Sequence, residues 1–185
     1  MKSKIVLTAI ASLAVWASTL AIAEDFTIEN FQRQPEARWQ FFADTVMGGV
    51  STGQVEFVQA NGDAYARMTG RVSTENNGGF IQFRMELLRS LPKDAVGLRL
   101  VIRGNDKRYF VHLRTSGMLL PWQYYQAGFD TTREWSEVRL PFTAFKASSR
   151  LLRTKPKPGT IRSIGIVAFG RNHQAEIDVR EVSYY

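Results

Sequence analysis

The chain contains no cysteine. This absence excludes a disulfide framework, a thiolate metal site and a lipid-anchor cysteine. Histidine is scarce as well, with only His112 and His173, and neither lies in a Ser-His-Asp arrangement or in a cluster with metal-ligand spacing. We therefore expect no enzyme activity, no metal site and no cofactor.

A single long apolar run is present, and it lies at the N-terminus. Lys2 and Lys4 precede an uncharged stretch over residues 5–20, and Ala21-Ile22-Ala23 forms a small-x-small cleavage site. The stretch is short for a bilayer-spanning helix, and no basic stop-transfer cluster follows it. The pattern predicts a secretory signal peptide over residues 1–23 and no transmembrane segment after cleavage.

Cleavage leaves residues 24–185, which is enough chain for one hydrophobic core and too little for two ordinary domains. We therefore expect one domain. Because the signal has the bacterial pattern and no anchor follows it, we expect the protein to lie in the periplasm or to be secreted.

Acidic residues are missing from the stretch between Glu137 and Glu176, although basic residues are frequent there. Five of the basic residues lie close together in the sequence: Lys146, Arg150, Arg153, Lys155 and Lys157. This stretch would attract anionic surfaces such as lipid headgroups or phosphate-bearing polymers. The alternative is a solvated loop that keeps the protein soluble. Nucleic acid is not an expected partner of an exported protein.

Strand signals dominate after residue 54, and no segment has the pattern of a long amphipathic helix. Asn61-Gly62, between two runs of β-branched and aromatic residues, is a strong hairpin signal. The expected strands are 54–60, 64–72, 80–87, 97–103, 109–115, 123–129, 136–140, 164–169 and 175–184. Short strands at this spacing predict an all-β sandwich or jelly roll.

Side chains two residues apart on a strand lie on the same face of a sheet. This alternation assigns to the core Ile81, Phe83, Met85, Tyr109, Val111 and Leu113. In residues 123–129 it leaves two sets, Tyr125 with Ala127 and Phe129, or Tyr124 with Gln126. If the three strands are neighbours, one outer face carries Gln82, Arg84, His112, Arg114, Tyr124 and Gln126.

A mixed polar and aromatic face suits a sugar or a peptide. Planar rings stack on such ligands, and forked arginine donors orient hydroxyl or carboxylate groups. The alternative is an ordinary solvated sheet face.

The most specific string lies over residues 39–53. Gly48-Gly49 permits a positive φ or a close backbone approach, and Asp44 and Ser51 can bind exposed amides of a turn. A phosphate-cradling loop is the second interpretation, but the lysine and the helix of a nucleotide loop do not follow. We therefore favour a turn that closes one end of the sandwich. If that turn folds over the polar face, Asp44 would orient an arginine there.

Several motifs together resemble a known family, and they extend over nearly all of the mature chain. They are Trp39, residues 44–51, Gly78-Gly79-Phe80 with Arg84, Gly104 with Tyr109, residues 113–115, residues 124–127 with Phe129, Trp135 with Val138, residues 140–142 with Phe145, and Ile164-Gly165. On these residues the chain resembles the complex I intermediate-associated protein 30 family.

The resemblance implies a galactose-binding-like jelly-roll β-sandwich over residues 24–185, a fold shared with carbohydrate-binding modules. Mitochondrial members of the family look like assembly factors for respiratory complex I. The secretory signal departs from that pattern, because bacterial complex I keeps its peripheral arm in the cytoplasm. Fold kinship alone does not transfer function.

Two functions follow from these observations. The first is an exported, non-catalytic module that binds an envelope glycan or another extended ligand. The second is an assembly factor or scaffold that binds a protein partner with the same surface. The candidate ligand-binding residues are Arg84, His112, Arg114, Tyr124, Gln126 and Asp44.

Two further expectations concern side chains outside this face. Four large aromatic side chains should be buried and dominate the core: Trp39, Trp135, Phe142 and Phe145. Glu176 and Asp178 share a strand face, and we interpret them as residues of a solvated edge rather than as an acid and base pair.

Overall fold

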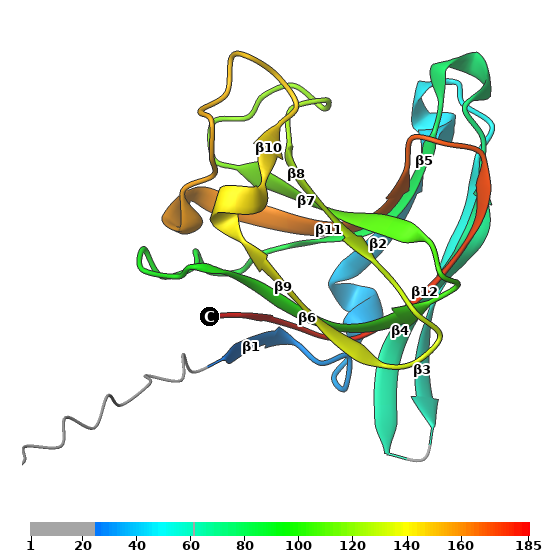
Figure 1. The fold of residues 1–185 in the computed structure, drawn as a ribbon, viewed down its shortest axis with the longest axis horizontal. Coiled ribbons are helices and arrows are strands. Elements are labelled where there is room, and N and C mark those ends of the chain that lie inside the picture. Colours follow the sequence, from blue (N-terminus) through cyan, green and yellow to red (C-terminus); the bar gives the residue numbers. More distant parts are fainter. Residues whose placement is uncertain (1–24, 61) are drawn as a thin grey trace, which may run out of the picture.

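A computed structural model describes residues 25–60 and 62–185 of the chain (Figure 1). The predicted signal peptide over residues 1–23 and Asn61 of the predicted hairpin turn lie outside the described residues.

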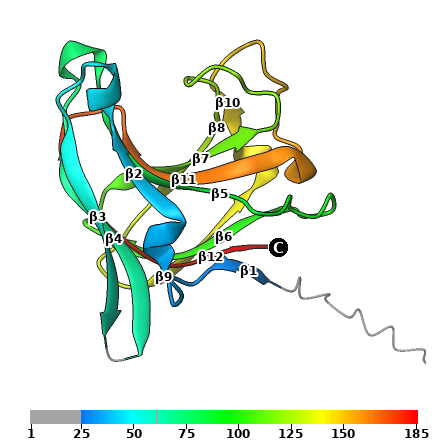
Figure 2. The same ribbon diagram turned by 180° about the vertical axis from the view of Figure 1, so that it is seen from behind.

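Within the described residues, twelve strands form two antiparallel sheets that pack face to face (Figures 1 and 2). Sheet A has the order β3 (Thr52–Ala60), β4 (Asp63–Val72), β12 (His173–Tyr184), β6 (Gly97–Gly104) and β9 (Ser136–Pro141), with β1 (Phe26–Glu29) also paired to β12. Sheet B has the order β10 (Lys146–Ala147), β8 (Tyr125–Asp130), β7 (Arg108–Thr115), β11 (Ile161–Phe169), β5 (Phe80–Glu86) and β2 (Trp39–Ala43). The predicted all-β sandwich is confirmed.

The helical segments of the described residues are short 3₁₀ turns in the connections. They are η1 (Pro35–Ala37), η2 (Asp44–Met47), η3 (Glu75–Asn77), η4 (Phe142–Ala144) and η5 (Pro158–Thr160). Within residues 25–60 and 62–185, none of these is long or apolar enough to cross a bilayer.

The core lies between the two sheets, and strand alternation selects its side chains. All six residues that the alternation assigns to the core are buried, as are Tyr125, Ala127 and Phe129 from the set that remained open. Trp39, Phe142 and Phe145 are buried too, as expected. These inward aromatic and β-branched side chains supply the apolar contact that stabilises a domain without disulfides.

The expectation that Trp135 belongs to the core is wrong. Trp135 is only half-buried, on the outer face of sheet A, where the guanidinium carbons of Arg103 and Arg180 lie 4.6 and 4.2 Å from the centre of its ring. Trp135 directly precedes β9 and lies two residues before Glu137, which points outward. Strand alternation therefore gives the correct side, and the size of the side chain misled the prediction.

The interpretation of Glu176 and Asp178 as edge residues is also wrong. β12 has β4 on one side and β6 on the other, so it lies inside sheet A. Asp178 is only 3% exposed because Arg67 and Arg103 cover it, each with a nitrogen 2.8 Å from a carboxylate oxygen. Glu176 is exposed.

The sequence did not predict three of the strands, which are β1, β2 and β10. β1 and β10 are short, with four and two residues, and each pairs at the side of a longer strand. β2 comprises Trp-Gln-Phe-Phe-Ala, where the outward residue after the inward Phe41 is itself a phenylalanine, so the alternation is hidden. That outward ring, Phe42, belongs to the site described next.

Candidate ligand-binding groove

A groove of about 660 Å³ lies on the outer face of sheet B. Two projections rise from this face (Figures 1 and 2), and residues from both of them line the groove. One projection carries η2 and η3, and the other is formed by the loops around β8 and β10. The lining residues are Phe42, Val46, Met47, Phe80, Gln82, Arg84, His112, Arg114, Pro121, Trp122, Tyr124 and Phe169.

The register of the strands places the polar side chains of the floor side by side. Arg84 of β5 pairs with Gly165 of β11, Gly165 pairs with His112 of β7, and His112 pairs with Gln126 of β8. The three predicted strands lie in one sheet, but β11 separates β5 from β7, so the predicted face exists with one more strand in it than expected. Gly165 contributes no side chain to the middle of the row, and a Cβ there would come within 3.0 Å of the Gln82 side-chain oxygen. The floor is therefore hollow at its centre.

His112 and Tyr124 form a stacked pair on this floor. Their ring centres are 4.0 Å apart and their planes differ by 10°, and the Phe169 ring meets His112 edge-on at 5.8 Å. The Nε2–H of His112 donates to the Gln126 side-chain oxygen at 2.8 Å, so Gln126 positions the ring from the next strand. Burial lowers the pKa of His112 to about 4, and the Gln126 hydrogen bond offsets only part of this effect. The ring is therefore neutral near pH 7.

The two arginines are held mainly by neutral groups. The guanidinium carbon of Arg84 lies 4.7 Å from the centre of the Phe42 ring, and its Nε is 3.6 Å from a carboxylate oxygen of the exposed Glu86. Arg114 donates to the carbonyl oxygens of Pro121 at 2.7 Å and Met118 at 3.4 Å. Burial and the nearby Arg84 lower the pKa of Arg114. Two fixed cations thus lie near each other on the floor of the groove with little opposing charge.

Asp44 is the first residue of η2, in the projection that carries η2 and η3, and its side chain has no exposed surface. Its carboxylate accepts from the Ser51 amide at 2.9 Å, the Ser51 hydroxyl at 2.5 Å, and the amides of Gly79 and Phe80 at 2.5 and 3.2 Å. Burial alone would raise the pKa of Asp44, but these hydrogen bonds outweigh it and lower the pKa.

The structure therefore does not support a place for Asp44 in the ligand face. Its carboxylate organises the turn, and the expected pairing with an arginine is wrong. The amides that a phosphate cradle would need already bind Asp44, so this string is a structural turn. A Cβ at Gly49 or Gly78 would collide with the same carboxylate, and Gly48 has a φ of +88°. Among the described residues, no group of three His, Asp or Glu side chains could hold a metal ion.

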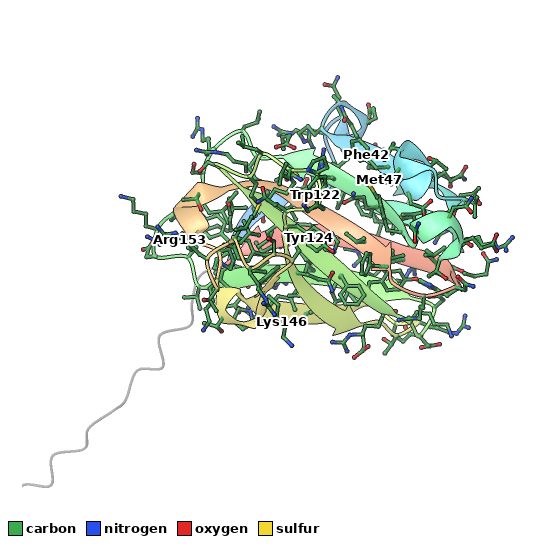
Figure 3. The ribbon with its side chains drawn as sticks, turned by 90° about the horizontal axis from the view of Figure 1, so that it is seen from above. Phe42, Met47, Trp122, Tyr124, Lys146 and Arg153 are labelled. Carbon is green, nitrogen blue, oxygen red and sulfur yellow. The ribbon has the colours of Figure 1, made fainter. Side chains whose placement is uncertain are left out.

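The sequence analysis missed the apolar walls of the groove. Val46 and Met47 of η2 are 72% and 59% exposed, and Trp122 on the opposite projection is 61% exposed. Figure 3 shows Tyr124 between Lys146 on one side and Phe42 with Met47 on the other. One signal was available: Leu119-Leu120-Pro121-Trp122 is an apolar run that lies in a loop rather than in a strand.

Comparisons with known proteins support the fold. The sequence profile of complex I intermediate-associated protein 30 matches residues 28–179. The comparison with curated protein sequences finds no match.

Among solved structures, the family 11 carbohydrate-binding module of the cellulosomal cellulase Lic26A-Cel5E of Clostridium thermocellum has a TM-score of 0.69 at 10% identity, covering 87% of this chain and 94% of that one. A family 11 module from the same organism, in complex with a β-1,3-1,4-mixed-linked tetrasaccharide, has a TM-score of 0.65 at 13% identity, covering 86% and 94%. The agarase AgWH50C has a TM-score of 0.59 at 8% identity, covering 86% of this chain and 24% of the agarase. At these identities the likeness shows the jelly-roll fold.

Proposed function

Because the chain belongs to the complex I intermediate-associated protein 30 family and folds like carbohydrate-binding modules, we propose that it is a non-catalytic binding protein whose groove takes an extended glycan. The predicted signal peptide supports export, so the proposed ligand is a glycan of the cell envelope, met in the periplasm or outside the cell.

The stacked pair of His112 and Tyr124 beside Arg114 carries this proposal. A pyranose ring has an apolar face that packs on an aromatic ring, and its hydroxyls accept hydrogen bonds from fixed donors. Tyr124 is already held in plane by His112, so little freedom is lost when a sugar packs against it. Arg114 is likewise fixed by two carbonyl oxygens before any ligand binds.

The chemistry of the lining favours binding over hydrolysis. The lining residues of the groove include one histidine, two arginines and no carboxylate. Glycoside hydrolysis requires a pair of carboxyl groups on either side of the scissile bond. His112 is neutral and already engaged with Gln126, so it is poorly suited to act as a general base.

Calorimetry with peptidoglycan fragments, neutral β-glucans and acidic envelope glycans tests the proposal. We expect one of these classes to bind, and Tyr124→Ala and Arg114→Ala each to weaken it at least about tenfold. Tyr65→Ala is the matched control, because Tyr65 is a half-buried ring on the outer face of sheet A. If folded Tyr124→Ala and Arg114→Ala proteins bind as well as the parent, the groove is not the glycan site.

A protein partner is the second candidate function, and the exposed side chains of Val46 and Met47 favour it. The family name points to association with an intermediate of complex I. Two variants separate the functions: Met47→Ser should weaken a protein complex recovered by cross-linking in cells more than it weakens glycan binding, and Tyr124→Ala should weaken glycan binding more than the protein complex.

A further inference from the structure

The projection on the β8 and β10 side of the groove consists of residues 116–123 and 146–157, which we call the basic lobe. Ser148 joins its two segments: its amide donates to the Tyr124 carbonyl at 2.9 Å, and its hydroxyl donates to the Trp122 carbonyl at 2.8 Å. The Tyr124 amide donates back to the Ser148 hydroxyl at 3.0 Å. Figures 1 and 2 show both segments rising together above sheet B. The lobe is therefore one connected surface.

Large apolar side chains point into solvent from both segments of the lobe. Leu119 and Leu151 are 87% and 84% exposed, and Trp122 is 61% exposed. Each is an apolar surface that water solvates at a cost, and each lies at a loop position where the core does not require it. Exposed large apolar side chains on two segments that are joined by hydrogen bonds indicate a binding surface.

The charge around these side chains has one sign. Lys146, Arg150, Arg153, Lys155 and Lys157 are all exposed, and none forms an ion pair with any residue among 25–60 and 62–185. The sequence contains no Asp or Glu over residues 107–129 or 138–175, which include both segments of the lobe. Figure 3 shows Lys146, Arg153 and Trp122 around Tyr124 on the same side of the molecule.

We propose that the basic lobe docks the protein on an anionic lipid bilayer. Exposed leucines and a tryptophan enter the interface between headgroups and acyl chains, and surrounding lysines and arginines are attracted to negative headgroups. A free anion would use the charges and leave the leucines in water, whereas a bilayer engages both kinds of side chain. The lobe thus fits a lipid surface in both respects.

Docking in this manner fixes the orientation of the groove. Pro121 and Trp122 belong to the lobe and also line the groove, so the mouth of the groove lies next to the membrane surface. The docking proposal does not depend on the identity of the groove ligand.

Flotation with vesicles tests the docking, using the processed protein purified after export. We expect binding to vesicles of about equal phosphatidylglycerol and phosphatidylcholine to be at least about tenfold stronger than binding to phosphatidylcholine alone, and to weaken with salt. Two double variants, Leu119→Ser with Leu151→Ser and Lys146→Glu with Arg153→Glu, should each lower binding about tenfold. All variants share one N-terminus, so their differences report on the lobe.

Two control variants lie outside the lobe. Leu88→Ser changes a leucine that is 92% exposed in the connection after β5, and Arg71→Glu changes an exposed arginine on the outer face of sheet A. Both should bind vesicles like the parent. Equal binding to neutral and anionic vesicles, or full binding by the folded double leucine variant, would overturn the proposal. Glycan binding in solution should persist in that variant, which separates failure of docking from failure of the groove.

Discussion

The outer faces of both sheets carry arginines, but the arginines of the two faces have different partners. On sheet A, Arg67 and Arg103 both bind Asp178 at 2.8 Å, and Arg99 binds Glu137 and Glu181 at 2.6 Å each. On sheet B, Arg84 and Arg114 contact mainly a ring and carbonyl oxygens. An arginine whose charge is neutralised by a carboxylate has a structural role in the sheet, whereas an arginine held by neutral groups remains available to bind a ligand.

The two tryptophans that lie outside the core, Trp135 and Trp122, show the same contrast. Trp135 on sheet A is covered by two arginines, and Trp122 beside sheet B is 61% exposed next to a groove. We call the outer face of sheet A the closed face, because its arginines are paired with carboxylates, and the outer face of sheet B the open face. Both consist of outward strand positions, so strand position alone does not distinguish them. They differ in whether neighbouring strands provide carboxylates for the arginines.

The largest expected effect compares Trp39 with Trp135. Trp39 is 2% exposed, packs on Phe83, and donates its indole N–H to Glu29 at 3.0 Å. Trp39→Ala should lower the free energy of unfolding by about 3–5 kcal/mol, and Trp135→Ala by about 1–2 kcal/mol. Urea unfolding measures both, and equal losses would show that the arginine cover on Trp135 acts like a core.

Removing the Asp178 carboxylate should destabilise the protein through the outer face of sheet A. Asp178→Ala leaves Arg67 and Arg103 without their shared carboxylate, and we expect a loss of about 3 kcal/mol. Thermal and urea unfolding measure this loss, and Asp178→Asn, which keeps the volume, is its control. Ligand binding in the groove should be unchanged, and a parallel loss of binding by folded protein would contradict the separation of the two faces.

The pH dependence of stability tests whether His112 is buried in the groove floor of sheet B. The pKa of His112 is about 4 in the folded protein and about 6.5 when unfolded. The unfolded chain therefore takes up this proton first as the pH falls, and stability declines between about pH 6.5 and 4. We expect the parent to lose about 2–3 kcal/mol more than His112→Gln over that range. Identical pH profiles of urea unfolding for the two proteins would show that His112 is solvated.

The smallest expected change in stability concerns Arg114. Arg114→Ala should cost less than about 1 kcal/mol, because its hydrogen bonds go to loop carbonyls at the surface. Arg103→Ala on sheet A should cost more, about 1–2 kcal/mol, since Asp178 loses one of its two partners. Thermal unfolding of the two variants side by side checks this order, and the reverse order would mean that Arg114 is a structural residue.

Much of the groove floor could be predicted, because it depends on alternation along strands. Arg84, His112, Arg114 and Tyr124 do line one face, and Gln126 lies beside them as the support of His112. Their roles as ligand-binding residues remain a prediction.

The walls could not be predicted in this way, since Met47 and Trp122 lie in connections where no periodicity fixes direction. Asp44 was misassigned because a short motif does not show which amides converge on a carboxylate. The fold itself was accessible from the residues that resemble the family, because those motifs extend over the whole sandwich.

The pairing of β1 with the end of β12 has a mechanical consequence. Phe26 lies opposite Tyr184 in this antiparallel pair, with their rings stacked at 5.2 Å, so the two ends of the described chain leave the domain at the same point. A pulling force between those ends breaks the hydrogen bonds between β1 and β12 one after another. Hydrogen bonds that break one after another withstand a smaller force than bonds that must break simultaneously. β1 would therefore peel away first under tension. β2 of sheet B follows β1 in the chain, so the groove should keep all its strands until β1 has peeled away.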